Sequence, residues 1–508
     1  MGYPYIHIDC DGKTANGHYK VNFGTPVRFE TGLGGIFGSW NWNGEMLQAE
    51  VDPYGMFSLF YTQTSNGIML STSPIQLLSL GAPSEIDETA LTVFHLLGWY
   101  INEDTPFKHI KVLPPAARLT WCNGKLSILG RKLVKSKINI DRTAAILEYE
   151  RLFSAAIRSC WQTITDPVII PLSGGRDSRH ILLESTRQGY VPDHCVTYDP
   201  TFGHPSAYDP EWACAKQITE LVNIKHEKIK TLQSRHADQL RTIYLSHLGT
   251  DEHVQFLALS RHLAGKTFLD GIGGDTLSRN KNISTDITRA KTSSERVTDI
   301  LSYFDKVSGN SIRDRILGLQ VGDDAIEHAR LQIVACYDKY SEQPDPYSHF
   351  FFWQRTRREI GLAPGAMLSS AKHVLCPYLD PALVEFCLAL PDEITADGKF
   401  HDHVIRHSFP EVDIPYHDQF KPILPAPPLT VKAYSMADAV LSKFNLGVLA
   451  MAKEPFSQVR MLVDRRYKGL HFWRTYHEVI LSLGDRKFKG PFCINLNLSR
   501  PRPPVNRA

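Results

Sequence analysis

Long apolar runs are missing from this sequence, because no stretch approaches the roughly 18 uninterrupted apolar residues of a membrane-spanning helix. The first residues, MGYPYIHIDCDGK, also lack the basic and apolar segments of a secretory signal peptide. We therefore expect neither a membrane partner nor secretion, and the sequence predicts a cytoplasmic protein.

Cysteine offers no structural framework. The nine cysteines are an odd number and are scattered from Cys10 to Cys493 without C-x-x-C spacing. This distribution fits reduced thiols and argues against a disulfide scaffold or a cysteine-based zinc site. Cys160, Cys214 and Cys387 lie in amphipathic helical patterns, so we expect them to be small core residues.

Neither positive nor negative residues are in large excess. The net charge of +2 implies no nucleic acid or other polyanion as a partner. A local basic run, Arg355, Arg357 and Arg358, could contact a phosphate, although a solvated helix face is the default reading. A chain of 508 residues is long for a single core, so at least two domains are expected.

One stretch joins a buried strand to a glycine turn and then to a helix. It is VIIPLSGGRDS, residues 168–178, followed by a helix predicted over residues 179–188. The apolar run suits a parallel strand whose two faces are covered by helices. Gly174 and Gly175 let backbone N–H groups approach a ligand closely, and the helix adds its positive N-terminal end. The pattern predicts an anion site, with a strand-turn-helix corner as the structural alternative.

The motif is neither a Walker A loop, which needs a lysine missing here, nor G-x-G-x-x-G. It resembles the S-G-G-x-D-S signature of the PP-loop ATP pyrophosphatases, in particular the asparagine synthetase-like branch, whose members cleave ATP between its α- and β-phosphates. A carboxylate at Asp177 could hold a divalent metal against phosphate, and the hydroxyl of Ser178 could donate to a phosphate oxygen.

A second glycine-rich loop follows another short strand, Thr267 to Leu269, in KTFLDGIGGDTLSRN. Its glycines could bring Asp275 back toward the first loop. The segment resembles the G-E-G-x-D-E stretch of asparagine synthetases and the G-Y-G-x-D stretch of β-lactam synthetases, whose aspartate is a magnesium ligand. Asp177 and Asp275 would then be two carboxylates at the carboxyl ends of neighbouring strands, an arrangement suited to Mg²⁺.

The residues up to about 133 alternate in short segments broken by Asn-Gly and Asp-Pro, which indicates hairpins in an antiparallel, sandwich-like unit. One helix is expected from Glu88 to Tyr100, opened by Asp87. The segments Asp52-Pro53-Tyr54-Gly55 and Leu113-Pro114-Pro115 resemble the glutaminase domain of asparagine synthetases.

A glutaminase of this type uses the free amine and thiol of an N-terminal cysteine as base and nucleophile. Here residue 2 is glycine, and the backbone nitrogen of Cys10 is an amide. We therefore expect a degenerate, structural domain and an enzyme that does not depend on glutamine.

Between the two glycine loops, residues 194–199 and 223–230 each predict a further strand. We expect the first of these to end beside the strand at 168–172, at the switch point of the sheet, where an adenine would bind. Farther on, Pro377-Tyr378-Leu379-Asp380 resembles a P-F-L-D segment of the family, with a role mainly in packing.

The resemblance implies ATP and Mg²⁺ as cofactors and a set of site residues. Metal ligands would be Asp177 and Asp275; ATP contacts would be Leu172, Ser173, Gly174, Gly175, Asp177, Ser178 and Gly273; catalytic residues would be Glu359 and Lys421. For Glu359 there are two alternatives, a role as the catalytic base and a surface ion pair with an arginine. Lys421 is displaced by about three residues from the family lysine that neutralises pyrophosphate, and His417 lies closer to the register. Arg176 and Arg179 either contact substrate or phosphates, or pair with acids at the helix start.

The predicted fold is α/β. Residues 139–495 would form a doubly wound parallel-sheet PP-loop (adenine nucleotide α-hydrolase-like) synthetase domain with a helical C-terminal part. Residues 1–138 would form a degenerate Ntn-type antiparallel β-sandwich, and residues 496–508 a disordered tail.

The resemblance implies an AMP-forming amide synthase that adenylates a small-molecule or peptide carboxylate and lets an amine displace AMP, as in β-lactam synthetases and lasso-peptide cyclases. A homodimer is one expectation for its assembly. One alternative is amidation with free or partner-supplied ammonia. Another is a non-catalytic nucleotide-binding scaffold, suggested by Ile272 where β-lactam synthetases carry a tyrosine.

Overall fold

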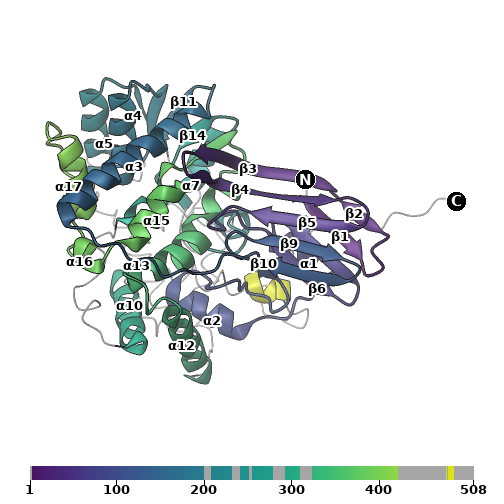
Figure 1. Ribbon diagram of the computed structural model, residues 1–508. Coiled ribbons are helices and arrows are strands. Elements are labelled where there is room, and N and C mark those ends of the chain that lie inside the picture. Colours follow the sequence, from purple (N-terminus) through teal and green to yellow (C-terminus); the bar gives the residue numbers. More distant parts are fainter. Residues whose placement is uncertain are drawn as a thin grey trace, which may run out of the picture.

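The computed structural model describes residues 3–199, 208–230, 241–250, 254–278, 292–308, 323–420, 476 and 479–484. These residues form a mixed α/β protein with two antiparallel sheets on one side and a parallel sheet with its helices on the other (Figure 1). None of the described helices has the length and apolar character needed to cross a membrane.

The two antiparallel sheets have five strands each. The first has the order β2 (Ala15–Gly17), β1 (Tyr5–Asp9), β7 (Gly67–Ser71), β6 (Phe60–Thr64), β8 (Lys111–Val112). The second has the order β10 (Lys125–Leu129), β9 (Arg118–Cys122), β5 (Met46–Val51), β4 (Gly32–Trp42), β3 (Lys20–Phe29). Side chains from both sheets, such as Ile8 and Trp121, belong to one hydrophobic core.

The Asn-Gly pairs at 43–44, 66–67 and 123–124 lie at hairpins, as the sequence predicts. Asn123 and Gly124 join β9 to β10 with φ angles of 48° and 74°, the positive values that a two-residue hairpin turn of the primed type requires. The Asp52-Pro53 break is different, because β5 and β6 belong to different sheets. The expectation of a hairpin there is wrong, and the segment instead carries the chain from one sheet to the other.

Asp52 organises this crossing from inside the core. Its side chain is fully buried and accepts hydrogen bonds from the backbone N–H groups of Tyr54 at 3.0 Å, Met56 at 3.1 Å and Phe57 at 2.8 Å. Burial raises the pKa of the Asp52 carboxyl to about 6, and the hydrogen bonds lower it only in part.

The parallel sheet has the order β13 (His226–Lys230), β12 (His194–Asp199), β11 (Val168–Pro171), β14 (Thr267–Leu269), β15 (His373–Leu375). The chain starts in the middle at β11, moves outward through β12 and β13, and then returns to the other side of β11 with β14 and β15. The order therefore reverses between β11 and β14, and the prediction of a switch point at the end of β12 is wrong. Strand β15 was not predicted.

Helices surround this sheet and connect it to the antiparallel half (Figure 1). The described helices are α1 (Pro74–Ser79), α2 (Glu88–Leu97), α3 (Arg142–Gln162), α4 (Asp177–Arg187), α5 (Pro210–Leu221), α7 (Val254–Leu263), α8 (Gly274–Leu277), α10 (Ser293–Ser308), α12 (Asp323–Asp338), α13 (Pro346–Phe350), α14 (Leu362–Gly365), α15 (Pro381–Ala389), α16 (Asp392–Thr395) and α17 (Phe400–Ser408). A π-helix, η1 (Phe351–Ile360), and two 3₁₀ turns, η2 (Pro377–Leu379) and η3 (His417–Gln419), complete the set.

Helix α2 begins after Asp87 as predicted, but it ends at Leu97 because Gly98 adopts a left-handed φ of 93°. Cys160, Cys214 and Cys387 are buried, which confirms them as core residues.

The basic run on η1 holds the two halves of the protein together. Arg357 donates to the carbonyl oxygen of Leu113 at 2.9 Å, and Arg358 donates to the carbonyl oxygens of Asn102 and Asp104. Both arginines are buried, and burial lowers the pKa of Arg358 to about 9. The prediction of a solvated helix face is therefore wrong for Arg357 and Arg358, since both reach into the antiparallel half.

Asp52 gives the stability of the protein a measurable pH dependence. In the folded protein its carboxyl releases its proton near pH 6, whereas in the unfolded chain it does so near its ordinary value of about 4. Its contribution to stability is therefore present at low pH and is lost as the pH rises through this window. Relative to Asp52→Asn, the free energy of unfolding of the wild type should fall by about 2 kcal/mol between pH 4 and pH 7. Urea unfolding of both proteins across this range tests it, and a difference that does not vary with pH would contradict it.

Candidate functional site

Two glycine-rich loops meet at the carboxyl edge of the parallel sheet. Strands β11 and β14 pair directly, with Val168 opposite Thr267 and Ile169 opposite Phe268, so the segments that follow them leave the sheet side by side. A Cβ atom on Gly274 would lie 2.7 Å from Cγ and Oδ1 of Asp177. The second loop can therefore rest on Asp177 only because it has no side chain there.

Three carboxylates gather at this edge. Burial, followed by the negative charge of Asp177, raises the pKa of Asp275, and the same two causes raise the pKa of Asp270 to about 6. Arg355 acts in the opposite direction and lowers the pKa of Asp275. Asp270 is the residue directly after β14, and sequence reasoning missed it. Its position at the carboxyl end of a predicted strand was the available signal.

A buried polar network supports Asp177 from behind. Its Oδ1 atom lies 3.3 Å from Nδ1 of His401 on α17, yet accepts no hydrogen bond from any described residue. His401 in turn contacts Ser278 at 3.1 Å through Nδ1 and His180 at 3.1 Å through Nε2. Burial is the main reason that the pKa of His180 falls well below its usual value. Oδ1 of Asp177 is thus a buried acceptor whose hydrogen-bonding capacity is unused.

Tyr378, from the segment that resembles P-F-L-D, braces the same residue. Its hydroxyl donates to the backbone carbonyl oxygen of Asp177 at 3.1 Å. Its ring would lie 2.9 Å from a Cβ atom on Gly274 and stacks on Phe153 with centroids 4.8 Å apart. The predicted packing role of this segment therefore includes fixing the backbone at Asp177.

The first loop makes hydrogen bonds within itself. The N–H of Ser173 donates to the hydroxyl of Ser178 at 3.0 Å, and the N–H of Gly175 donates to the hydroxyl of Ser173 at 3.1 Å. A phosphate would need to take over these donors or use others in the loop. Leu172 is buried, and both its backbone groups bond to β12, at Val196 and Thr197. Gly273 has a φ of 93°, which a side chain would strain.

A segment far along the chain covers this loop. The N–H of His417 donates to the carbonyl oxygen of Gly174 at 3.0 Å, and a Cβ atom on Gly174 would lie 2.7 Å from Cβ of His417. Arg179 holds the segment through the carbonyl oxygens of Ile414 at 2.5 Å and Pro415 at 2.8 Å. His417, noted for its register in the sequence, therefore lies on the predicted phosphate loop.

Arg176 and Arg179 both stack on Tyr416, each with its guanidinium carbon 4.2 Å from the ring centroid. Arg176 also pairs with Asp402 and, at 3.0 Å, with Asp418. Of the two readings of these arginines, pairing with acids holds for Arg176, although the acids come from distant segments and not from the helix start. Arg179 binds carbonyl oxygens.

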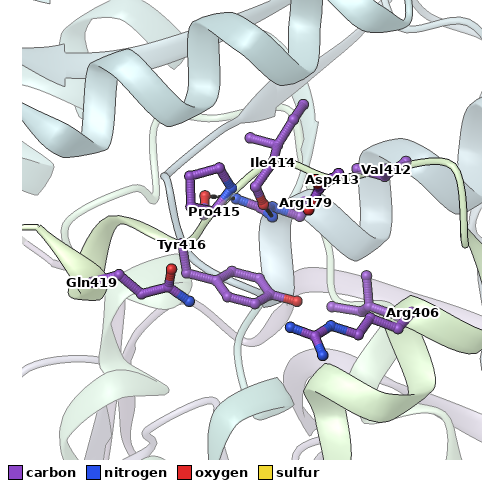
Figure 2. A pocket seen from close by; sticks show the side chains of 9 residues that line it. Arg179, Arg406, Val412, Asp413, Ile414, Pro415, Tyr416 and Gln419 are labelled. Atoms are coloured by element: carbon purple, nitrogen blue, oxygen red, sulfur yellow. Dashed lines mark hydrogen bonds between the residues drawn. The ribbon is translucent and has the colours of Figure 1, made fainter.

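A cavity of about 120 Å³ lies beside Arg179, and the side chain of Tyr416 extends there toward Arg406 (Figure 2). A second cavity, of about 270 Å³, lies between β3 and residues 364–374. Neither of these two cavities is lined by Asp177 or Asp275.

Glu359 lies on η1 and is buried, with Oε2 2.8 Å from Nε of Arg355. An ion pair was one expectation for Glu359, but it is not on the surface. The same helix contacts the second loop, because the hydroxyls of Thr356 and Thr276 lie 2.7 Å apart. Lys421 falls outside the described residues.

No family model matches the chain, and no curated protein matches it in sequence. Carboxylate oxygens are the ligands that Mg²⁺ prefers, and a buried oxygen of Asp177 accepts no hydrogen bond from the described residues. The residues present therefore fit a hard divalent cation.

The contact between Gly274 and Asp177 predicts the effect of a single methyl group. Alanine is normally more stable than glycine in a helix, by about 1 kcal/mol. Here Gly274→Ala should instead lower the free energy of unfolding by about 1–3 kcal/mol, because the added Cβ would overlap Asp177 and Tyr378. Chemical denaturation measures it. Gly32→Ala is the control, because its Cβ would meet only Pro381 at 3.9 Å. Equal stability of the two variants would contradict the close approach.

The contacts of Arg179 predict that its substitution will loosen residues 412–420. Lysine keeps the charge but loses the planar fork that reaches two carbonyl oxygens at once. Arg179→Lys should therefore speed backbone hydrogen exchange in residues 412–420, measured by mass spectrometry. Arg187→Lys on the same helix is the control, because Arg187 is half-exposed and pairs with Glu184. If both variants exchange like the wild type, Arg179 does not hold the segment.

Proposed function

We propose that the protein is an ATP-dependent, AMP-forming amide synthase that adenylates a carboxylate and lets an amine displace AMP. The observation that carries this proposal is the meeting of the two glycine loops at the reversal between β11 and β14. Open parallel sheets bind ligands at such a point, outside the carboxyl ends of their strands. Asp177 and Asp275 come from these two loops, as the resemblance to asparagine synthetase-like enzymes implies.

In this proposal the parallel sheet and its helices form a PP-loop domain, and the two antiparallel sheets form a degenerate Ntn-type sandwich. The strand order and the shared core of the antiparallel sheets support the assignment. Asp52 and Leu113, from the two segments that resemble the glutaminase domain, lie at the crossing between sheets and at the contact with Arg357. Their role is then to support the synthetase half.

The residues take defined roles. Asp177 and Asp275 would hold Mg²⁺, with Asp270 as a third carboxylate, while Ser173, Gly174, Gly175 and Ser178 would contact the phosphates. Mg²⁺ would neutralise charge that develops on pyrophosphate as it leaves. Tyr378 and His401 would keep Asp177 in position.

The reaction consists of two substitutions. A carboxylate oxygen of the substrate attacks the α-phosphorus of ATP, and the bond from that phosphorus to the bridging oxygen breaks, so that pyrophosphate leaves. The amine nitrogen then attacks the acyl carbon, gives up a proton to a base, and AMP leaves with the electrons of the acyl C–O bond. Glu359 remains the candidate base, but its pairing with Arg355 means that it must first separate from that guanidinium to accept a proton. Ammonia, free or supplied by a partner, could replace the amine in the same scheme.

A non-catalytic nucleotide-binding scaffold is the second candidate. The contact of His417 with Gly174 favours it, because the predicted phosphate loop is covered in this conformation. The amide synthase requires residues 414–417 to move when ATP binds, whereas a scaffold does not require turnover.

The decisive experiment is product analysis with Mg·ATP and a panel of amino acids, peptides and small diacids. The enzyme should release AMP and pyrophosphate with one class of carboxylate. Asp177→Asn should reduce this turnover by at least about 100-fold, because it removes a charged ligand at the leaving group. Asp166→Asn is the matched control, since Asp166 pairs with Lys372 before β11 begins, at the far end of that strand.

Each possible outcome distinguishes between the proposed functions. ADP in place of AMP would overturn the proposed reaction. ATP binding without turnover across the panel, unchanged in Asp177→Asn, would favour the scaffold. Equal turnover in Asp177→Asn and Asp166→Asn would show that Asp177 is not part of the catalytic site.

A further inference from the structure

A second group of potential metal ligands lies apart from the three aspartates. His194 begins β12, Glu227 is the second residue of β13, and His262 lies in the last turn of α7. One atom from each, two imidazole nitrogens and one carboxylate oxygen, lies within 4.8 Å of the others. Neither the sequence motifs nor the proposed synthase chemistry assigns a role to this group.

The cluster lies toward the amino edge of the parallel sheet. Ile169, near the start of β11, pairs with His194, and Val196 of β12 pairs with Glu227. Asp177 and Asp275 follow the carboxyl ends of β11 and β14. The cluster and the proposed nucleotide site are therefore at opposite edges of the same sheet.

The distances fit a small transition metal. Nε2 of His194 lies 3.4 Å from Nε2 of His262 and 3.9 Å from Oε2 of Glu227, and Nε2 of His262 lies 3.8 Å from the same oxygen. The point equidistant from these three atoms is about 2.1 Å from each of them, which is close to the Zn–N and Zn–O bond lengths of protein sites. A modest contraction of the triangle would place the metal above its plane and leave a fourth position for water.

The surroundings set the chemical state of the ligands. Oδ2 of Asp193 lies 2.6 Å from Nδ1 of His194, so that nitrogen carries the proton and Nε2 keeps its lone pair. A carboxylate behind a histidine is the usual outer partner of a metal-bound imidazole. The ammonium of Lys225 lies 2.6 Å from Oε1 of Glu227, which leaves Oε2 facing the two imidazoles.

The solvent exposure of the three side chains and the charges around them also suit metal binding. The side chain of His194 is 8% exposed, whereas those of His262 and Glu227 are 25% and 36% exposed, so the cluster can be reached from solvent on one side. Burial, followed by the positive charge of Lys266, lowers the pKa of His262. The Nε2 atoms of His194 and His262 lie 3.4 Å apart, which is longer than a normal N–H hydrogen bond.

We propose that His194, Glu227 and His262 bind one Zn²⁺ ion through Nε2, Oε2 and Nε2, with water in the fourth position. Two imidazoles and one carboxylate suit zinc and its neighbours in the first transition series, and not Mg²⁺ or Ca²⁺, which prefer oxygen. The ion would tie β12, β13 and α7 together at the edge of the sheet.

The test uses the full-length, tag-free protein after treatment with a chelator. Titration with Co²⁺ should give the visible absorption of a four-coordinate site, should saturate at one equivalent, and should be reversed by Zn²⁺. Glu227→Gln and His262→Ala should each weaken Zn²⁺ binding by at least about 100-fold, and Asp193→Asn should weaken it by about 10–100-fold. Zn²⁺ should also raise the midpoint of thermal unfolding of the wild type but not of Glu227→Gln.

His109→Ala is the matched control, because His109 is a half-exposed histidine that pairs with Glu85 in the antiparallel half. It should bind Zn²⁺ as tightly as the wild type. Absence of saturable Co²⁺ and Zn²⁺ binding in the wild type would overturn the site. Unchanged affinity in Glu227→Gln would do the same, even if His262→Ala failed to fold, because Gln preserves the shape of the side chain.

Discussion

The direct pairing of β11 with β14 is the constraint on which the candidate site depends. Only two residue pairs define this register, yet they place the ends of two strands from distant parts of the chain next to each other. The loops that follow are therefore in close contact. The side chain of Asp177 occupies the space that a side chain at position 274 would need, so only glycine fits there. Polar groups from α17 and η2 close around the same aspartate, so the site is assembled from four regions of the chain.

The sequence was most informative where one residue type is required by backbone geometry. The strand at Thr267 to Leu269, the Asn-Gly hairpins and the start of α2 after Asp87 were all predicted. Each of them is marked by residues next to it in the sequence, namely glycine and asparagine in turns and a capping aspartate at the helix start. The two glycine loops were located for the same reason. That their strands are neighbours was predicted correctly, but the switch point was placed at β12, since strand order depends on contacts between distant segments.

Long-range partners were the part that sequence reasoning could not supply. His401 lies more than two hundred positions from Asp177, and nothing in its local pattern distinguishes it from other histidines of the chain. His194, Glu227 and His262 likewise come from three separate elements with no motif spacing. The arginines at 357 and 358 were given a surface role because a run of charge usually marks a solvated face, but tertiary packing overrides that rule here.

The junction between the two halves has a further consequence for how this protein can change over time. Arg357 and Arg358 recognise Leu113, Asn102 and Asp104 largely through main-chain carbonyl oxygens. A carbonyl oxygen is present whatever side chain a residue carries, so substitutions at these three positions leave the acceptors in place if the backbone path is kept. These three positions can therefore change in sequence while their contacts with Arg357 and Arg358 are preserved.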